Sequence, residues 1–332
     1  MPKYAFTTQL NRDSSTGVIG KLKNLSWGAN LVLNYGIPAK AFHFGGGLGD
    51  HLLCSSVFHE LGRRGIQKCW MLSHYPEIFQ NNPYGLQVVP DDWKTIKLLQ
   101  KIKRPSTLLY YGKWIGDKDK IDPPKKHIIS EILQKCDIKG DVCLRPYWYG
   151  DTRPITLLPK NDYICIQSTK TYSSTPMLNK QWDEDSFIKV IKLLKDKFEV
   201  VQLGTIEEPR LPYTIDQRNL GISDSATLLA HAKFFIGQVG FLMHLARAVD
   251  TRSVIIYGGR EKAWQSGYPC NENIETSPNC SPCWQNNQCD FHRECMSEIS
   301  SEDLLRAVNR LEARLSQDLE IDTAFLCDYF KN

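Results

Sequence analysis

The sequence has no long hydrophobic run. Its 332 residues include no stretch of about 18 consecutive apolar residues, the least that a membrane-spanning helix needs. The first residues, MPKYAFTTQLNRDSS, also lack the apolar centre of a secretory signal peptide. We therefore expect a protein of the cytoplasm without a transmembrane segment, and a peripheral position at the inner membrane is compatible with this.

A strong excess of one charge is also missing. The chain has 41 Lys and Arg against 37 Asp and Glu residues, a net charge of +4. Such a small and scattered excess argues against nucleic acid as a partner but suits a small phosphate-bearing ligand. Hydrophobic residues make up 42% of the chain, enough for a sizeable core, and the length suggests about two domains of roughly 100–200 residues each.

Apolar runs and amphipathic stripes alternate along most of the chain. The first apolar run is followed by a glycine-rich loop over 45–50 and a helical pattern over 51–65. After an irregular stretch at 146–159 the same alternation begins again, and a last helix is expected from about residue 301, where Ser-x-x-Asp is a capping-box pattern. We expect strands at 41–44, 68–72, 107–111, 162–167, 198–203, 234–237 and 253–259.

Strands that alternate with helices predict a parallel sheet covered on both faces. Because the pattern occurs twice, we predict an α/β protein with two Rossmann-like domains that face each other across a cleft, the GT-B architecture. We expect an irregular extension over residues 1–38, a first domain over 39–155 and a second over 156–332.

The loop GGGLGD at 45–50 carries the first chemical signal. A glycine-rich turn between a strand and a helix lets a ligand approach backbone N–H groups, so Gly47 and Gly49 are candidate ligand-binding residues, although glycines also serve in tight turns alone. Asp50 is compatible with an ordinary N-cap. In an open α/β sheet, however, this position faces the ligand cleft, where a carboxylate can accept a proton from an attacking hydroxyl.

Four of the eleven cysteines cluster with the spacing C-x2-C-x5-C-x5-C. Four thiolates can form a tetrahedral site for zinc or iron, and a metal would order this polar segment, residues 280–295. The second pair lacks C-x-x-C spacing, so free or oxidised thiols remain the alternative. The segment is also suited to an interface between copies of the chain. The four candidate ligands are Cys280, Cys283, Cys289 and Cys295.

Six segments, taken in order, resemble the motifs of glycosyltransferase family 9, the ADP-heptose-dependent heptosyltransferases. The similarity extends from about residue 41 to residue 308. The segments are GGGLGDHLLCSSVFHELGRRG, NNPYGLQVV, KQWDEDSFIKVIKLLK, VVQLGTIEEP, IGQVGFLMHLARAVDTRSVIIYGG and CSPCWQNNQCDFHRECMSEI. The resemblance implies an inverting glycosyltransferase that moves heptose from ADP-heptose to a hydroxyl of a glycan or protein. It also implies that the first domain binds the acceptor and the second the donor.

The resemblance assigns roles residue by residue. Asp50 matches the family's catalytic base, and Lys180 matches the lysine that contacts the donor diphosphate. Glu208 matches a carboxylate that binds the ribose hydroxyls, with Glu207 as a near alternative. A lysine and a helix N-terminus can stabilise the leaving diphosphate, so we expect no catalytic metal.

One segment departs from the family pattern. Val239, Gly240 and Phe241 stand where the family usually has Asp, Thr and Gly. The backbone N–H groups of Gly240 and Phe241 can still bind pyrophosphate. His244 matches the family's histidine, with a core histidine as the alternative.

The departure leaves other functions open. They are a transferase for another nucleotide sugar and a non-catalytic protein that binds a nucleotide sugar or assembles with partners. A dinucleotide-dependent oxidoreductase is weaker, because the loop lacks the complete G-x-G-x-x-G and the acidic residue about twenty positions on.

Overall fold

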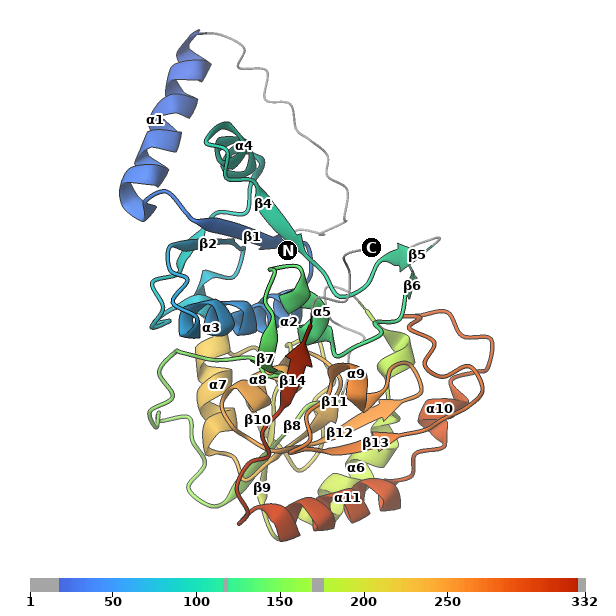
Figure 1. Ribbon diagram of the computed structural model, residues 1–332. Coiled ribbons are helices and arrows are strands. Elements are labelled where there is room, and N and C mark those ends of the chain that lie inside the picture. The colour runs from blue at the N-terminus through green and yellow to red at the C-terminus, as the bar shows by residue number, and fades with distance from the viewer. Residues whose placement is uncertain (1–17, 116–118, 169–175, 328–332) are drawn as a thin grey trace.

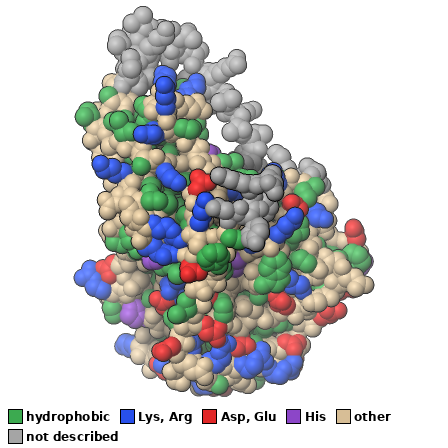
Figure 2. Space-filling model, viewed as in Figure 1, with side chains coloured by type: hydrophobic (Ala, Val, Ile, Leu, Met, Phe, Trp, Pro, Cys, Tyr) green, Lys and Arg blue, Asp and Glu red, His purple; other side chains and the backbone are tan. Residues whose placement is uncertain are grey.

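The computed structural model describes residues 18–115, 119–168 and 176–327. Figure 1 shows two α/β halves, one above the other, in contact along the middle of the molecule. Within the described residues, no helix has the length and hydropathy to cross a membrane. On the face drawn in Figure 2, Lys and Arg side chains lie among Asp and Glu side chains, as the small net charge suggests.

The first half is built on a four-stranded parallel sheet in the order β3-β2-β1-β4. The strands are β1 (Lys40–Phe44), β2 (Cys69–Leu72), β3 (Gln87–Val89) and β4 (Ser106–Leu109), and β5 (Trp114–Ile115) and β6 (Lys120–Ile121) form a separate hairpin. The helices are α2 (Leu48–Leu53), α3 (Ser55–Arg63), α4 (Trp93–Lys101), α5 (Ile128–Gln134) and the 3₁₀ turn η1 (Pro76–Phe79).

The helix expected over 51–65 begins earlier and is interrupted. α2 starts at Leu48, which places Asp50 in its first turn, and α3 follows after Cys54. The hydroxyls of Ser55 and Ser56 donate to the carbonyls of Leu52 and Leu53 at 2.6 and 2.7 Å. Such bonds to the preceding turn compete with the helical ladder and bend it, which accounts for the break.

The second half is built on a six-stranded parallel sheet in the order β10-β9-β8-β11-β12-β13. This corresponds to the Rossmann order 3-2-1-4-5-6. The strands are β8 (Tyr163–Ile166), β9 (Glu199–Gln202), β10 (Ile215–Asp216), β11 (Phe235–Gln238), β12 (Ser253–Gly258) and β13 (Glu272–Glu275). The helical elements are η2 (Leu178–Lys180), α6 (Glu184–Leu194), α7 (Ile222–His231), α8 (Phe241–Ala248), α9 (Ala263–Ser266), α10 (Glu294–Ser297) and α11 (Ser301–Arg314). The expected capping box of α11 is present, with Ser300 as N-cap and Asp303 as its partner.

The expected irregular extension is wrong for part of its length. Residues 1–17 lie outside the described part, but α1 (Val18–Tyr35) is a helix beside α4 at the far end of the first half (Figure 1). Its buried Leu31 belongs to a small apolar cluster with Trp70 of β2 and Leu99 of α4. The helix therefore packs on the first domain.

The C-terminal end of the chain does not stay with the second half. β14 (Thr323–Leu326) pairs antiparallel with β7 (Gly140–Cys143), with Phe325 opposite Asp141. A division at residue 155 therefore leaves one strand of this two-stranded sheet on each side. One apolar cluster also spans both halves, because Leu52 and Leu53 of α2 belong to the same cluster as Val239 and Leu242.

Candidate functional site

The order of the strands reverses once in each sheet. In the first sheet the reversal lies between β1 and β4, and in the second between β8 and β11. In open α/β sheets, ligands bind at such a point, outside the carboxyl ends of the strands. Asp50 lies in the first turn of α2, after β1; Tyr111 follows β4; and Gly240 and Phe241 follow β11.

The helices that begin at the two points of reversed strand order, α2 and α8, are in contact. An added Cβ on Gly49 would lie 3.5 Å from the Cα of Phe241 and 3.6 Å from its backbone nitrogen. The first turns of α2 and α8 therefore lie close together, with space between them for no more than about a methyl group at position 49. Gly240 itself has φ 163° and ψ −163°, an extended conformation open to any residue.

Each oxygen of the Asp50 carboxylate accepts a hydrogen bond that holds the side chain in place. Oδ2 accepts a hydrogen bond from the Gly47 backbone N–H at 2.8 Å, and Oδ1 accepts one from the Tyr111 hydroxyl at 2.9 Å. The first bond is the return half of a capping box, so the structural role of Asp50 is real. A side chain at Gly46 would clash with the carboxylate, since its Cβ would lie 2.1 Å from Oδ2.

Burial raises the pKa of Asp50 above its usual value, and the hydrogen bonds from Tyr111 and Gly47 and the charge of Lys180 act against the rise. Lys180 belongs to the second half of the chain. Its charge acts on the carboxylate of the first half, so the two candidate residues lie within electrostatic reach of each other.

Lys180 ends η2 and is 8% exposed. Its ammonium lies 2.6 Å from Oε1 of Glu261, a residue after β12. Burial lowers the pKa of Lys180, and the Glu261 charge opposes this. For Glu261, burial alone would raise the pKa, but Lys180 and Arg260 outweigh it and bring the pKa down to about 2. The pair is therefore an ion pair at neutral pH.

Glu208 occupies the carboxyl edge of the second sheet. Its Oε1 accepts from Gln167, just after β8, and from the backbone of Thr205, both at 3.1 Å. Gly204 has φ +139°, and an added Cβ there would lie 2.4 Å from the Glu208 carboxylate. Because Glu207 is exposed while Glu208 is buried, Glu208 is the better candidate of the two.

His244 lies one turn into α8 and is buried. Its Nδ1 lies 2.6 Å from the hydroxyl of Tyr268, whose ring it meets edge-on. This contact supports the core-histidine alternative. Val239, which replaces the family's Asp, is also buried and belongs to the apolar cluster shared by the two halves.

The four cysteines of the segment 280–295, which we call the cysteine finger, are half-buried thiols. Cys283 and Cys289 both influence the pKa of Cys280 and of Cys295, so the thiols lie near one another. Among the residues that the structure describes, no group of three or more candidate ligands has a metal-binding arrangement.

Two residues that contact the candidate site residues, Tyr111 and Glu261, lie outside the family motifs of the sequence. Tyr111 ends a predicted strand, and the rule that ligands bind at the carboxyl end of a reversed strand points to it. Glu261 shows its importance only through its contacts, because nothing in the sequence indicates that it is buried beside Lys180.

Residues 156–297 match the model of glycosyltransferase family 9 (heptosyltransferase). A search of the curated proteins finds no match.

Solved structures of the same architecture resemble the chain. The structure of dodecameric iron-containing heptosyltransferase TibC in complex with ADP-D-β-D-heptose has a TM-score of 0.64 and 18% identity, over 84% of this chain and 77% of that one. TibC comes from enterotoxigenic E. coli H10407. A family 9 glycosyltransferase from Veillonella parvula has a TM-score of 0.61 and 11% identity, over 83% and 97%. The E. coli ADP-heptose LPS heptosyltransferase II has a TM-score of 0.58 and 12% identity, over 83% of this chain and 99% of that one. At these identities the likeness shows the fold, GT-B.

Proposed function

We propose that this protein, a GT-B glycosyltransferase whose residues 156–297 match the model of glycosyltransferase family 9, transfers heptose from ADP-heptose, with inversion, to a hydroxyl of a glycan or protein. The observation that carries this proposal is that Asp50 and Lys180, from opposite halves, lie within electrostatic reach of each other, and that Tyr111, which bonds Asp50, lies 6.3 Å from the ring of Trp284 in the second half. The first supplies a base and the second a cation for the leaving diphosphate.

Asp50 would act as the general base. Its raised pKa makes the carboxylate a stronger base than a solvated aspartate, and the bonds from Tyr111 and Gly47 hold it in one orientation. Each carboxylate oxygen has two acceptor sites, so these two bonds leave acceptor sites for the hydroxyl of a bound acceptor. As the hydroxyl oxygen attacks the anomeric carbon, its proton passes to Asp50 and the bond to the diphosphate breaks.

The departing diphosphate would be held by Lys180 and the start of α8. The first N–H groups of a helix have no acceptor within the helix, and the helix dipole adds a partial positive charge. Gly240 and Phe241 stand at this end of α8. Donors aimed at developing charge typically contribute about 3–4 kcal/mol each to the lowering of a barrier. Glu208 would bind the ribose hydroxyls of the donor.

Many glycosyltransferases bind a divalent metal through an Asp-x-Asp motif, and this chain has two such triplets, 117–119 and 183–185. Asp183 caps α6 by accepting from Ser186 at 2.7 Å. Asp119 accepts from the backbone of Gln288 at 2.9 Å, whereas Asp117 lies outside the described residues. Each of these two carboxylates thus has a structural role, and the proposed chemistry relies on Lys180 instead.

The cysteine finger would hold a structural zinc or iron ion. The thiols are near one another, but a metal would have to draw them into coordination, since no formed group exists among the described residues. TibC is an iron-containing protein. Bound metal would order the segment without taking part in the transfer. Metal analysis of the purified protein, with a Cys283→Ser variant as the control, tests this, and metal retained unchanged by the variant would contradict it.

Location and assembly are further proposals. We place the enzyme in the cytoplasm, with a peripheral position at the inner membrane, and propose that it self-associates. TibC is dodecameric. Sedimentation of the purified protein alone tests self-association, and co-sedimentation with lipid vesicles tests the peripheral membrane position.

The experiment that tests the proposed function measures binding and turnover of a nucleotide-sugar panel by wild type and Lys180→Ala. Saturable binding of ADP-heptose, weakened in the variant, would support the donor assignment. Preference for a different sugar would support the second candidate, a transferase for another nucleotide sugar, which buried Val239 favours because it removes the family's polar side chain there. Donor binding without turnover, unchanged by Asp50→Ala, would indicate a non-catalytic protein.

A further inference from the structure

Glu261 is a buried carboxylate that the proposed reaction does not use. It is 2% exposed and follows β12. Its Oε1 faces the Lys180 ammonium at 2.6 Å and the Arg260 guanidinium at 2.7 Å, and its Oε2 accepts from the Ser266 hydroxyl at 2.7 Å. A buried carboxylate with two cations and a hydroxyl around it is fixed in position.

The two cations beside Glu261 are in different situations. Arg260 donates to the carbonyl of Gln285 at 3.0 Å and to the side chain of Asn286 at 2.6 Å, and its guanidinium stands 4.9 Å from the centre of the Trp284 ring. Arg260 is thereby occupied with the protein. The ammonium of Lys180 has three donors and, among the described residues, is shown paired with Glu261 alone, so Lys180 is the better placed of the two cations to bind a ligand.

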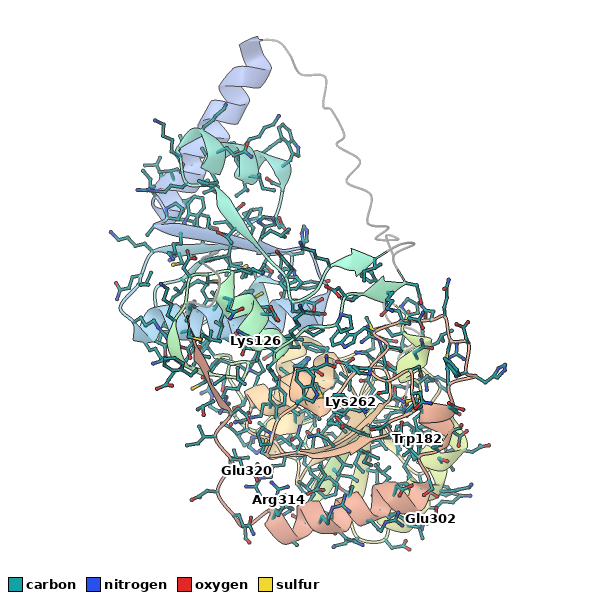
Figure 3. The ribbon with its side chains drawn as sticks, turned by 45° about the vertical axis from the view of Figure 1, so that its right-hand side comes forward. Lys126, Trp182, Lys262, Glu302, Arg314 and Glu320 are labelled. Atoms are coloured by element: carbon teal, nitrogen blue, oxygen red, sulfur yellow. The ribbon has the colours of Figure 1, made fainter. Side chains whose placement is uncertain are left out.

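The loop 284–288 of the cysteine finger holds the neighbours of Lys180 and Glu261 in place. Asn179, next to Lys180, donates through its side chain to the carbonyls of Gln285 at 3.1 Å and Gln288 at 2.7 Å. Its backbone N–H donates to Asn286 at 2.9 Å. Trp182, labelled in Figure 3 in the lower half of the molecule, anchors the other side of η2 by donating to the carbonyl of Ile299 at 2.9 Å.

The same loop also reaches the first half. The backbone N–H of Ile121 donates to the carbonyl of Trp284 at 3.1 Å, and Asp119 accepts from Gln288. The ring of Trp284 lies 6.3 Å from that of Tyr111, the residue that bonds Asp50. The finger loop therefore touches the supports of both Lys180 and Asp50.

We propose that Glu261 is a positioning residue, which holds the Lys180 ammonium charged and in one place for the donor diphosphate, and that the loop 284–288 fixes Glu261 through Arg260. This inference rests on the proposed function, in which Lys180 binds the donor.

The electrostatics agree with the geometry. Burial lowers the pKa of Lys180, and Glu261 is the main group that raises it again. The other charged groups that influence Lys180 are Arg260, which lowers its pKa, and Asp50, which raises it. Without the charge of Glu261, burial and Arg260 would lower the pKa of Lys180 further. The lysine then loses its proton at a lower pH, and with it the attraction for a diphosphate.

The test is the affinity of the full-length protein for ADP, measured by calorimetry at pH 7.5 and pH 9.5 in wild type, Glu261→Gln and Glu261→Asp. We expect Glu261→Gln to bind ADP about tenfold more weakly at pH 7.5 and to lose more affinity at pH 9.5 than wild type does. Glu261→Asp, which keeps the charge, should retain the pH profile of wild type. Glu272→Gln is the matched control, because Glu272 pairs with Arg310 and Arg314 away from the site.

The lysine itself provides the second comparison. In a Lys180→Ala background, Glu261→Gln should cause little further loss of ADP affinity, because its effect passes through the lysine. An equal loss in both backgrounds, or a pH profile of Glu261→Gln that matches wild type, would overturn the inference while leaving the proposed function intact. Failure of wild type itself to bind ADP would reject both. A fall in Tm without a change in the pH profile would show a purely structural role.

Discussion

At the scale of the residue, Asp50 combines an observed role in a helix cap with its proposed role as the base. Its Oδ2 closes the capping box on Gly47, and its Oδ1 accepts from Tyr111 across the point where the strand order reverses. Without the tyrosine, the charged form of Asp50 would lose one of the interactions that oppose the effect of burial. Tyr111 is thus a positioning residue for the proposed base.

We expect Tyr111→Phe to move the acid limb of the pH–rate profile to higher pH. The hydroxyl stabilises the charged carboxylate, so its loss raises the pKa of Asp50 further. The measurement is kcat/KM against pH. Tyr110→Phe is the control, because the Tyr110 ring lies against Lys135 and does not bond Asp50. An acid limb that does not move would contradict the role of Tyr111.

At the scale of the element, the contact of α2 with α8 brings the two halves of the site together. Gly49 allows the contact, because an added methyl group would reach ordinary van der Waals distance from Phe241, 3.5 Å, and a longer side chain would not fit. A side chain larger than a methyl group at this position would therefore press on the N-terminus of α8.

We expect Gly49→Ala to be tolerated and Gly49→Val to be damaging. Alanine gains up to about 1 kcal/mol of helix propensity over glycine, which offsets a snug contact. Valine would push α8 away from α2 and weaken ADP binding, with a loss of stability of about 1–3 kcal/mol typical of overpacking. Calorimetry with ADP and thermal unfolding measure the two effects. Equal behaviour of the two variants would show that the contact is loose.

At the scale of the whole molecule, a buried and neutral histidine, His127, joins the two halves, and its protonation at acid pH would destabilise the folded state. His127 of the first half faces the carbonyl of Gly267 in the second half at 3.0 Å, and its other ring nitrogen accepts from Ile129. Burial lowers the pKa of His127 to about 4. The ring is therefore neutral in the folded protein at pH 7.

We expect the protein to lose stability as pH falls from about 6.5 to about 4. The folded-state pKa of His127 is below that of a solvated histidine, so protons bind the unfolded chain preferentially and stabilise it in this window. The contribution is on the order of 3 kcal/mol at most. Urea unfolding at pH 7 and pH 4.5 measures it. His127→Gln should lose less stability between these pH values than wild type, and an equal loss would place the acid sensitivity elsewhere.

Strands were the most predictable part of the chain. Runs such as AFHF and SVIIYGG became β1 and β12, because strands buried on both faces require continuous apolar sequence. The helix α1 was missed, since its weak pattern is stabilised by Trp70 and Leu99, residues far along the chain. Cys54 interrupts a helix whose apolar spacing alone predicted continuity.

The sequence by itself determined two Rossmann-like halves and the residues that end their strands, because apolar periodicity and glycine-rich turns are local properties. It also pointed to Asp50 and Lys180 through its resemblance to one family. Only the tertiary structure decided that these two residues lie within electrostatic reach of each other, that Tyr111 bonds one and Glu261 the other, and that the finger loop contacts the supports of both. Ion pairs and buried hydrogen bonds depend on burial and on distance in space, and neither is encoded by spacing along the chain.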